Sequence, residues 1–208
     1  MLDSVPVDGD AIFSSVYFGE IPYYQELAKH SSVFIDLFER YKKQTWRSRT
    51  QILTGNGSLT LSVPVKRIHG KQTLMKDAII SNETDWRKDH WKAIESAYMH
   101  APYFFYYGDQ IKALIYSDIE HLFELNQLIF AQVVQWLDLS ITIKYTRRYV
   151  KQDPNTDYRL QLEKKTFNHS SQPYIQVFSD KAPFVSNLSI IDLLMNQGPL
   201  ARKWLTNN

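Results

Sequence analysis

Apolar residues recur along the chain at two spacings, and the shorter spacing predicts β-strands. Between residues 49 and 65 apolar and polar residues alternate on both sides of Asn56-Gly57. This pair adopts the positive backbone angles of a tight turn at little cost, so the segment predicts a β-hairpin. Further strands are predicted by short runs of β-branched and aromatic residues at 11–18, 31–38, 77–81, 141–149 and 173–178.

The longer spacing, in which apolar residues return every three or four positions, predicts helices. Trp86, His90 and Ala97 share one face of such a segment, and Pro102 stops it. Near the C-terminus Asn187 is expected to cap a helix that Gly198-Pro199 ends. The predicted helices occupy residues 22–30, 85–101, 109–116, 118–137 and 187–197.

Helices and short strands that alternate irregularly predict a mixed α/β (α+β) fold, in which helices pack on a mixed sheet that includes the hairpin. A chain of 208 residues with 44% hydrophobic content can bury its own core, so a single domain over residues 1–208 is expected. Residues 151–172 are polar and irregular, which predicts a long surface loop or lid.

Composition excludes several kinds of chemistry. The chain contains no cysteine, which removes thiol catalysis, disulfides and cysteine-bound metal. None of the six histidines stands in an HxxxH or HExxH pair, and no GxGxxG or GxSxG motif occurs, so neither a metal nor a cofactor is expected. A net charge of +2 does not favour a general nucleic-acid binder.

The N-terminal residues carry acidic side chains and no continuous apolar run, which is not typical of a secretory signal. No part of the sequence approaches the roughly 20 uninterrupted apolar residues that span a bilayer. A cytoplasmic location is therefore expected. No feature of the sequence indicates an oligomeric state.

Positive charge is concentrated in the segment 41–52, YKKQTWRSRTQI, which contains no acidic residue. If this segment is a strand, Arg47 and Arg49 share a face, and their guanidinium groups can converge on one phosphate or carboxylate. Lys43 would widen the positive field. The alternative is an exposed edge strand whose cations discourage aggregation.

Basic residues elsewhere in the chain favour the anion site over the exposed edge. Lys66 and Lys71 follow the predicted hairpin, and Arg147 lies near the end of the strand predicted at 141–149. All three could border the same cleft as the basic segment. The sequence therefore predicts a site for a small anionic ligand.

Three other features each allow a functional and a structural interpretation. His90 is either a hydrogen-bonded core histidine or a general base that faces a pocket, and the sequence alone favours the core. Asn126 interrupts an apolar stripe, which favours a buried amide that fixes packing. The aromatic run 103–107 can stack on a sugar or a base, or it can fill the core.

Five stretches of the chain resemble the WbqC-like protein family in their order and spacing. They read ERYKKQTWRSRTQI, GNGSLTLSVPV, WRKDHWKAIESAYMHAPYFFYYGD, PYIQVF and NLSIIDLLMNQGP, and the resemblance extends from about residue 16 to residue 198. The chain is particularly similar to the Bacteroidetes-type branch, in which a KQT-aromatic-RxR stretch is typical. It departs from the family at Ser48, where asparagine is common.

The resemblance implies a role in surface polysaccharide or O-antigen biosynthesis, the setting in which these proteins are mainly found. A glycine or other amino-acyl transfer to a sugar has been suggested for the family. The resemblance thus implies a transferase that acts on a nucleotide-linked or lipid-linked sugar. In such an enzyme Lys43, Arg47 and Arg49 would hold the phosphates.

The hypothesis of a transferase gives roles to three further side chains. His90 would act as a base, and Glu39 or Tyr41 would orient the acceptor. The alternative is a non-catalytic module that binds a sugar nucleotide, a glycan or RNA. The absence of a known catalytic motif supports that alternative.

Overall fold

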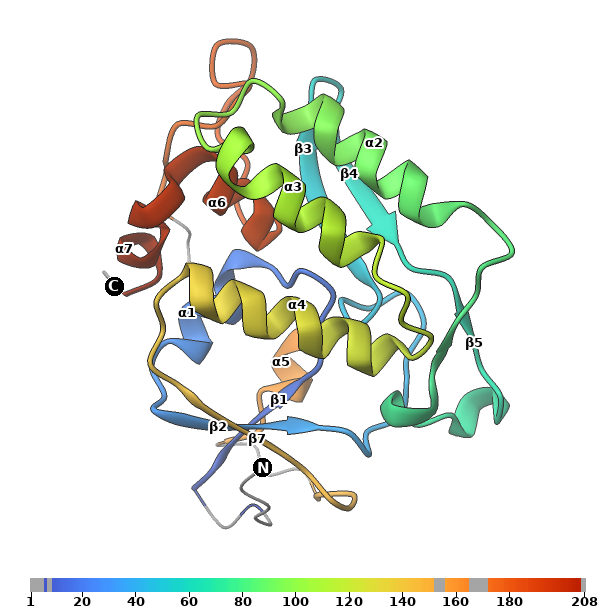
Figure 1. Cartoon of the computed structure of the whole chain (residues 1–208). Helices are drawn as coiled ribbons and strands as arrows, with labels where there is room; N and C mark the ends of the chain where they lie inside the picture. The colour runs from blue at the N-terminus through green and yellow to red at the C-terminus, as the bar shows by residue number, and fades with distance from the viewer. Residues whose placement is uncertain (1–5, 7–8, 152–155, 165–171, 207–208) are drawn as a thin grey trace.

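The computed structural model describes residues 6, 9–151, 156–164 and 172–206, and these residues form a mixed α/β fold. A parallel sheet with the strand order β1-β2-β7 lies in the lower part of the view in Figure 1. Its strands are β1 (Ala11–Ser14), β2 (Ser32–Asp36) and β7 (Thr142–Tyr145). Val33 pairs with Ala11 on one side and with Ile143 on the other, and a parallel bridge joins Ile12 to Asp157. The carboxyl ends of the strands therefore meet at one edge of the sheet.

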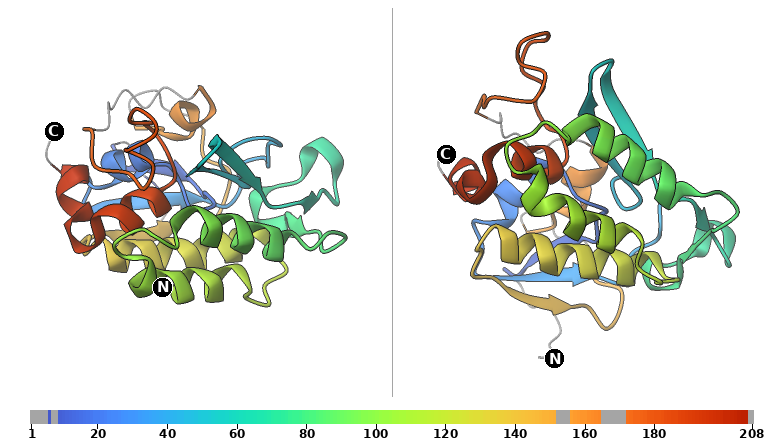
Figure 2. Two further views of the ribbon diagram at one scale, coloured as in Figure 1. Left: turned by 90° about the horizontal axis from the view of Figure 1, so that it is seen from above. Right: turned by 45° about the horizontal axis from the view of Figure 1, so that its top comes forward.

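Three helices lie side by side in a layer in front of the sheet and the hairpin (Figures 1 and 2). They are α2 (Trp86–Tyr98), α3 (Phe104–Ile115) and α4 (Leu122–Trp136). The apolar stripe of α4 faces the sheet, where the rings of Phe123 and Tyr145 pack edge to face with their centroids 5.7 Å apart. Within the described ranges, no helix is long and apolar enough to cross a membrane.

The remaining helices close the core around the sheet. They are α1 (Ile21–Leu27), α5 (Arg159–Lys164), α6 (Ile190–Gln197) and α7 (Ala201–Thr206). Pro22 suits the first turn of α1 because that position needs no amide donor. Helix α6 is buried along nearly its whole length, and its N-cap Ser189 accepts a hydrogen bond from the Ile191 amide at 3.3 Å.

The predicted hairpin is present as β3 (Arg49–Thr54) and β4 (Gly57–Ser62), with Gly57 at a φ of 102°. Beyond it, β5 (Val65–Lys66) pairs with β6 (Ile79–Ile80). Two short 3-10 helices, Gly70–Gln72 and Met75–Asp77, connect this pair.

The structure confirms the mixed α/β fold, the hairpin and the helix predicted at 85–101, but two predictions near the C-terminus are wrong. Residues 173–178 form no strand, because the backbone amide and carbonyl of Gln176 bond to Ser179 in a local turn. The side chains of Tyr174 and Gln176 bond to Asp192. Asn187 has a φ of 59° and does not cap α6, since Ser189 takes that position.

The described part of the segment 151–172 is more ordered than a surface loop. Residues 159–164 form α5, and Asp157 and Arg159 are almost fully buried. The other residues of the predicted lid, 152–155 and 165–171, lie outside the described residues. The interpretation of residues 151–172 as a loop or lid stays a prediction.

Candidate functional site at the carboxyl ends of the parallel strands

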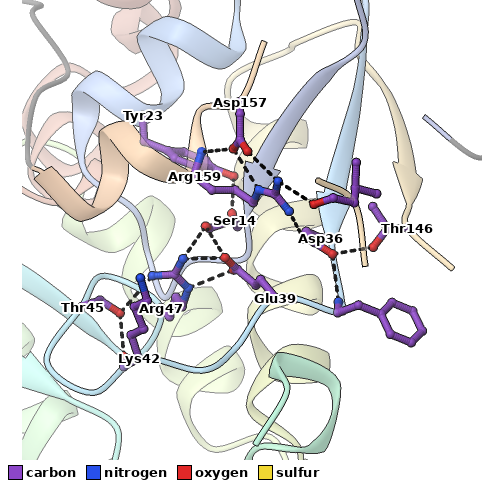
Figure 3. A network of polar contacts seen from close by, with 12 residues as sticks. Ser14, Tyr23, Asp36, Glu39, Lys42, Thr45, Arg47, Thr146, Asp157 and Arg159 are labelled. Carbon is purple, nitrogen blue, oxygen red and sulfur yellow. Dashed lines mark hydrogen bonds and ion pairs between the residues drawn. The ribbon is translucent and has the colours of Figure 1, made fainter. Parts of the chain in front are cut away.

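Polar side chains gather at the carboxyl ends of the parallel strands and form a buried network (Figure 3). Ser14 ends β1, Asp36 ends β2, and Thr146 directly follows β7. In open α/β sheets, ligands bind in the crevice outside this edge. Two arginines lie within the network: Arg159 joins Asp157 to Asp36, and Arg47 bonds Glu39 and Ser14.

Arg159 connects the segment beside β1 to the end of β2. Its Nε donates to Asp157 Oδ1 at 2.8 Å, its Nη2 lies 2.5 Å from Asp157 Oδ2, and its Nη1 contacts Asp36. Thr146 Oγ1 donates to Asp36 at 2.7 Å. Burial alone disfavours the guanidinium charge, but hydrogen bonds to Asp157 and the charge of Asp36 raise the pKa of Arg159. The arginine therefore stays charged in the core.

Arg47 makes the second junction, with Glu39 and Ser14. Its Nε and Nη2 donate to the two Glu39 oxygens at 2.9 and 2.5 Å, and Nη2 also contacts Ser14 Oγ at 3.0 Å. The Arg47 side chain is fully buried, and its backbone carbonyl accepts from Asn126 Nδ2 at 2.8 Å. The predicted packing role of Asn126 agrees with this contact.

The expectation that Arg47 and Arg49 lie on one face of a strand is wrong. Strand β3 begins at Arg49, so Arg47 lies in the preceding turn and the two arginines do not share a strand face. Arg47 points inward because the buried Glu39 carboxylate requires a partner. Arg49 is half-exposed and donates through Nε to Ser62 Oγ on β4 at 3.0 Å.

Glu39 is the member of this network whose ionisation is most relevant to chemistry. Burial raises the pKa of its carboxyl group, while the charge and hydrogen bonds of Arg47 offset part of that rise. Asp36 raises the pKa further, and a hydrogen bond from Ser14 lowers it. A raised pKa makes the carboxylate a stronger base than an exposed one, which suits a group that accepts and returns a proton.

A pocket of about 700 Å³ opens beside the network, and we call it the carboxyl-end pocket. Glu39 and Arg159 contribute to its wall from the network, while the exposed Arg40 and Lys42 add cationic groups from the chain that follows β2. The lining residues are Phe38, Glu39, Arg40, Lys42, Gln72, Leu74, Tyr149 and Arg159.

Backbone hydrogen bonds fix one wall of the carboxyl-end pocket. The Tyr41 amide donates to the Thr73 carbonyl at 2.9 Å, and the Met75 amide donates to the Glu39 carbonyl at 2.9 Å. These bonds hold the chain after β2 against the segment between the two 3-10 helices. Gln72 is thereby placed in the same wall as Glu39.

The remaining predicted ligand-binding residues lie outside the lining of the carboxyl-end pocket. Lys43, Lys71 and Arg147 are exposed, and Lys66 forms an ion pair of 2.9 Å with Glu83. Their contribution to anion binding stays a prediction, as does that of Arg49.

Tyr41 and His90 are buried and hydrogen-bonded. The Tyr41 hydroxyl lies 2.9 Å from Ser48 Oγ, at the position where the chain departs from the family pattern. The Tyr17 hydroxyl lies 2.9 Å from His90 Nδ1, and the His90 ring also bonds the Ser62 carbonyl. Burial lowers the pKa of His90 to about 4, although the bond to Ser62 and the charge of Asp89 act in the opposite direction. His90 does not line the carboxyl-end pocket, and its role as a base stays a prediction.

Sequence reasoning missed Asp36, Asp157 and Arg159 as members of this region. Asp36 ends an apolar run that was predicted as a strand, and that position was an available signal. Arg159 lies in a polar segment that gave no such signal. Among the described residues, no group of three or more histidine, aspartate or glutamate side chains is placed to hold a metal ion.

The protein thus belongs to the mixed α/β class, and its pocket lies at the carboxyl ends of a short parallel sheet and is bordered by cationic side chains. The chain belongs to the WbqC-like protein family, whose sequence model matches residues 15–171. That match includes Asp36, Glu39, Arg47 and Arg159.

The chain is also similar to a protein of Mycobacterium tuberculosis (strain ATCC 25618 / H37Rv) described as "Uncharacterized protein Rv1507c". The two are 32% identical over 123 residues, which cover 57% of this chain and 51% of that protein. The chain thus spans about half the length of the curated relative it matches. No solved structure matches the chain.

Proposed function

We propose that this protein transfers a group to a sugar whose phosphate, carried by a nucleotide or a lipid, binds in the carboxyl-end pocket. One observation carries the proposal: a buried carboxyl group, Glu39, lines the pocket with a raised pKa, and the exposed Arg40 and Lys42 border the same space. Membership of the WbqC-like family supports a cytoplasmic role in surface polysaccharide or O-antigen biosynthesis.

In the proposed reaction, Arg40 and Lys42 bind the phosphate of the sugar nucleotide or lipid-linked sugar. A hydroxyl or amine of the sugar attacks an activated donor, for example one that carries glycine or another amino-acyl group. Glu39 accepts the proton of that nucleophile as the new bond forms, and the leaving group departs with the electron pair of the bond that breaks. Gln72 and Tyr149 offer uncharged hydrogen-bonding groups in the same pocket.

Calorimetric titration with UDP-glucose, UDP-N-acetylglucosamine and GDP-mannose tests the binding step. The Arg40→Ala, Lys42→Ala double variant should bind the preferred sugar nucleotide at least about tenfold more weakly, since two charged contacts are lost. Lys88→Ala with Lys92→Ala removes the same charge from exposed positions outside the pocket and serves as the matched control. Equal losses in both double variants, or no binding to the wild type, would contradict the proposal.

One contact favours the second candidate, a non-catalytic binding module. The bidentate contact between Arg47 and Glu39, together with the Ser14 bond, occupies much of the carboxylate that would act as a base. Glu39→Gln separates the two functions in cells that depend on this gene. Loss of polysaccharide with retained sugar-nucleotide binding supports transfer, whereas unchanged polysaccharide supports a binding module.

A further inference from the structure

A second groove, of about 240 Å³, lies between the start of α3 and the end of α4, and we call it the α3–α4 groove. It shares no lining residue with the carboxyl-end pocket. Part of the aromatic run 103–107 belongs to it. Its lining residues are Tyr106, Tyr107, Gln110, Gln132, Gln135, Trp136 and Pro199.

Aromatic rings from two helices form one side of the α3–α4 groove. Tyr106 is 61% exposed, and its ring meets Tyr107 edge to face with the centroids 4.6 Å apart. Tyr107 is buried and meets Trp136 in the same manner at 5.3 Å. The buried ring thus fixes the positions of the two more exposed ones. Tyr and Trp rings combine an apolar face with a polar edge, which suits a ligand that has both characters.

Glutamine side chains form the polar part of the α3–α4 groove. Gln110 joins the two helices, because its Nε2 donates to the Tyr106 carbonyl at 2.8 Å and its Oε1 accepts from Trp136 Nε1 at 3.3 Å. Gln132 Nε2 donates to Gln135 Oε1 at 3.2 Å. In the part of the chain that the structure describes, no hydrogen bond uses Gln132 Oε1 or Gln135 Nε2.

A free acceptor and a free donor on adjacent side chains match the chemistry of hydroxyl groups. A hydroxyl both donates and accepts, so neighbouring hydroxyls of one sugar can satisfy Gln132 and Gln135 together. The lining residues of the groove carry no charge. A phosphate or a nucleic-acid backbone would find no cation there, whereas such ligands are held mainly by lysine and arginine.

We infer that the α3–α4 groove binds a neutral saccharide, with a sugar ring against Tyr106 and its hydroxyls bonded to Gln132 and Gln135. This site is separate from the carboxyl-end pocket and does not depend on the proposed transfer. It gives the protein a means to hold an uncharged glycan chain at a distance from the anionic ligand.

Calorimetric titration with maltohexaose, cellohexaose and mannohexaose tests the inference, because it measures binding directly. At least one of these oligosaccharides should bind, and Tyr106→Ala should weaken that binding at least about tenfold. Phe105→Ala is the matched control, since Phe105 precedes Tyr106, is 92% exposed and does not line the groove. Its dissociation constant should stay within about twofold of the wild type.

The glutamine pair provides a second variant that does not disturb the aromatic packing. Gln132→Ala with Gln135→Ala should also weaken binding of the oligosaccharide, while Tyr106→Ala should leave the affinity for sugar nucleotides unchanged. Absence of binding to all three oligosaccharides at millimolar concentration overturns the inference. Equal effects of Phe105→Ala and Tyr106→Ala also overturn it, as does salt-sensitive binding of single-stranded oligothymidylate that Tyr106→Ala abolishes.

Discussion

Arg47 donates hydrogen bonds to both oxygens of Glu39, at 2.9 and 2.5 Å. The Arg47 side chain is 0% exposed and the Glu39 side chain 8%. Replacing Arg47 by methionine leaves the buried carboxylate without its cation. We expect the free energy of unfolding to fall by about 3–5 kcal/mol, as measured by urea denaturation at neutral pH. Arg49→Met is the matched control and should change it by less than about 1 kcal/mol, because Arg49 is partly exposed.

A double variant separates the ion pair from simple packing at Arg47. If the loss comes from the unpaired carboxylate, Arg47→Met with Glu39→Leu should be more stable than Arg47→Met alone. The prediction fails if Arg47→Met and Arg49→Met destabilise the protein equally.

These two arginines show how far the sequence determines the site. The sequence shows that both are charged and lie in a basic segment. It does not show that Arg47 is buried and Arg49 is partly exposed. Which of the two is buried depends on where β3 begins and on Glu39, eight positions before Arg47. The local sequence pattern predicts neither the first residue of β3 nor the pairing of Arg47 with Glu39, because that pairing is a tertiary contact.

The fold was more accessible to sequence reasoning than the site, because its signals are local. The Asn56-Gly57 turn and the spacing of Trp86, His90 and Ala97 act within one element, and both predictions are confirmed. Arg159 instead contacts Asp36 across 123 positions of sequence. No periodicity or short motif encodes a partner so distant.

His90 predicts a defined dependence of stability on pH. Its pKa is about 4 in the folded protein and about 6.5 in an unfolded chain, so the unfolded state binds more protons between these values. The contribution of His90 to the free energy of unfolding should therefore be constant above pH ~6.5 and fall by about 3 kcal/mol as the pH decreases to ~4. The measurement is the difference in unfolding free energy between wild type and His90→Gln at each pH. A difference that does not vary between those two pH values would show that His90 is not held neutral.

Tyr174 holds the segment 173–178 against α6 through a hydrogen bond to Asp192. Its hydroxyl donates to Asp192 at 2.5 Å, and the Tyr98 hydroxyl donates to the same carboxylate at 2.9 Å. Tyr174→Phe removes one hydrogen bond to a buried acidic group and should cost about 1.5–3 kcal/mol of unfolding free energy. Tyr116→Phe, on a 46% exposed side chain, should cost less than about 0.5 kcal/mol. Similar thermal denaturation of the two variants would argue against this role of the Asp192 contact.

Gly198 and Gly70 both have a φ of 55°, and Gly198 also has a ψ of −131°, a combination that favours glycine. An alanine Cβ at Gly198 would lie 2.3 Å from the Tyr103 ring, whereas one at Gly70 would meet no atom within 4 Å. Gly70→Ala should cost about 1–2 kcal/mol for its positive φ. Gly198→Ala should cost about 1–3 kcal/mol more, for the clash with Tyr103 and for its unfavourable ψ. Adding Tyr103→Ala to Gly198→Ala should reduce the extra loss relative to Tyr103→Ala alone. Equal denaturation midpoints for the two alanine variants would contradict the clash.

The contact of Arg159 with Asp36 can form only late in synthesis of the chain, because its two partners are far apart in the sequence. Strands β1 and β2 leave the ribosome early, but Asp36 gains its cation only after more than a hundred further residues have been made. Until then the carboxyl end of β2 must remain hydrated, because burial of an unpaired carboxylate is costly. The wall of the carboxyl-end pocket that contains Arg159 is thus completed late in synthesis. A chain released before residue 159 would carry the three strands without a finished pocket.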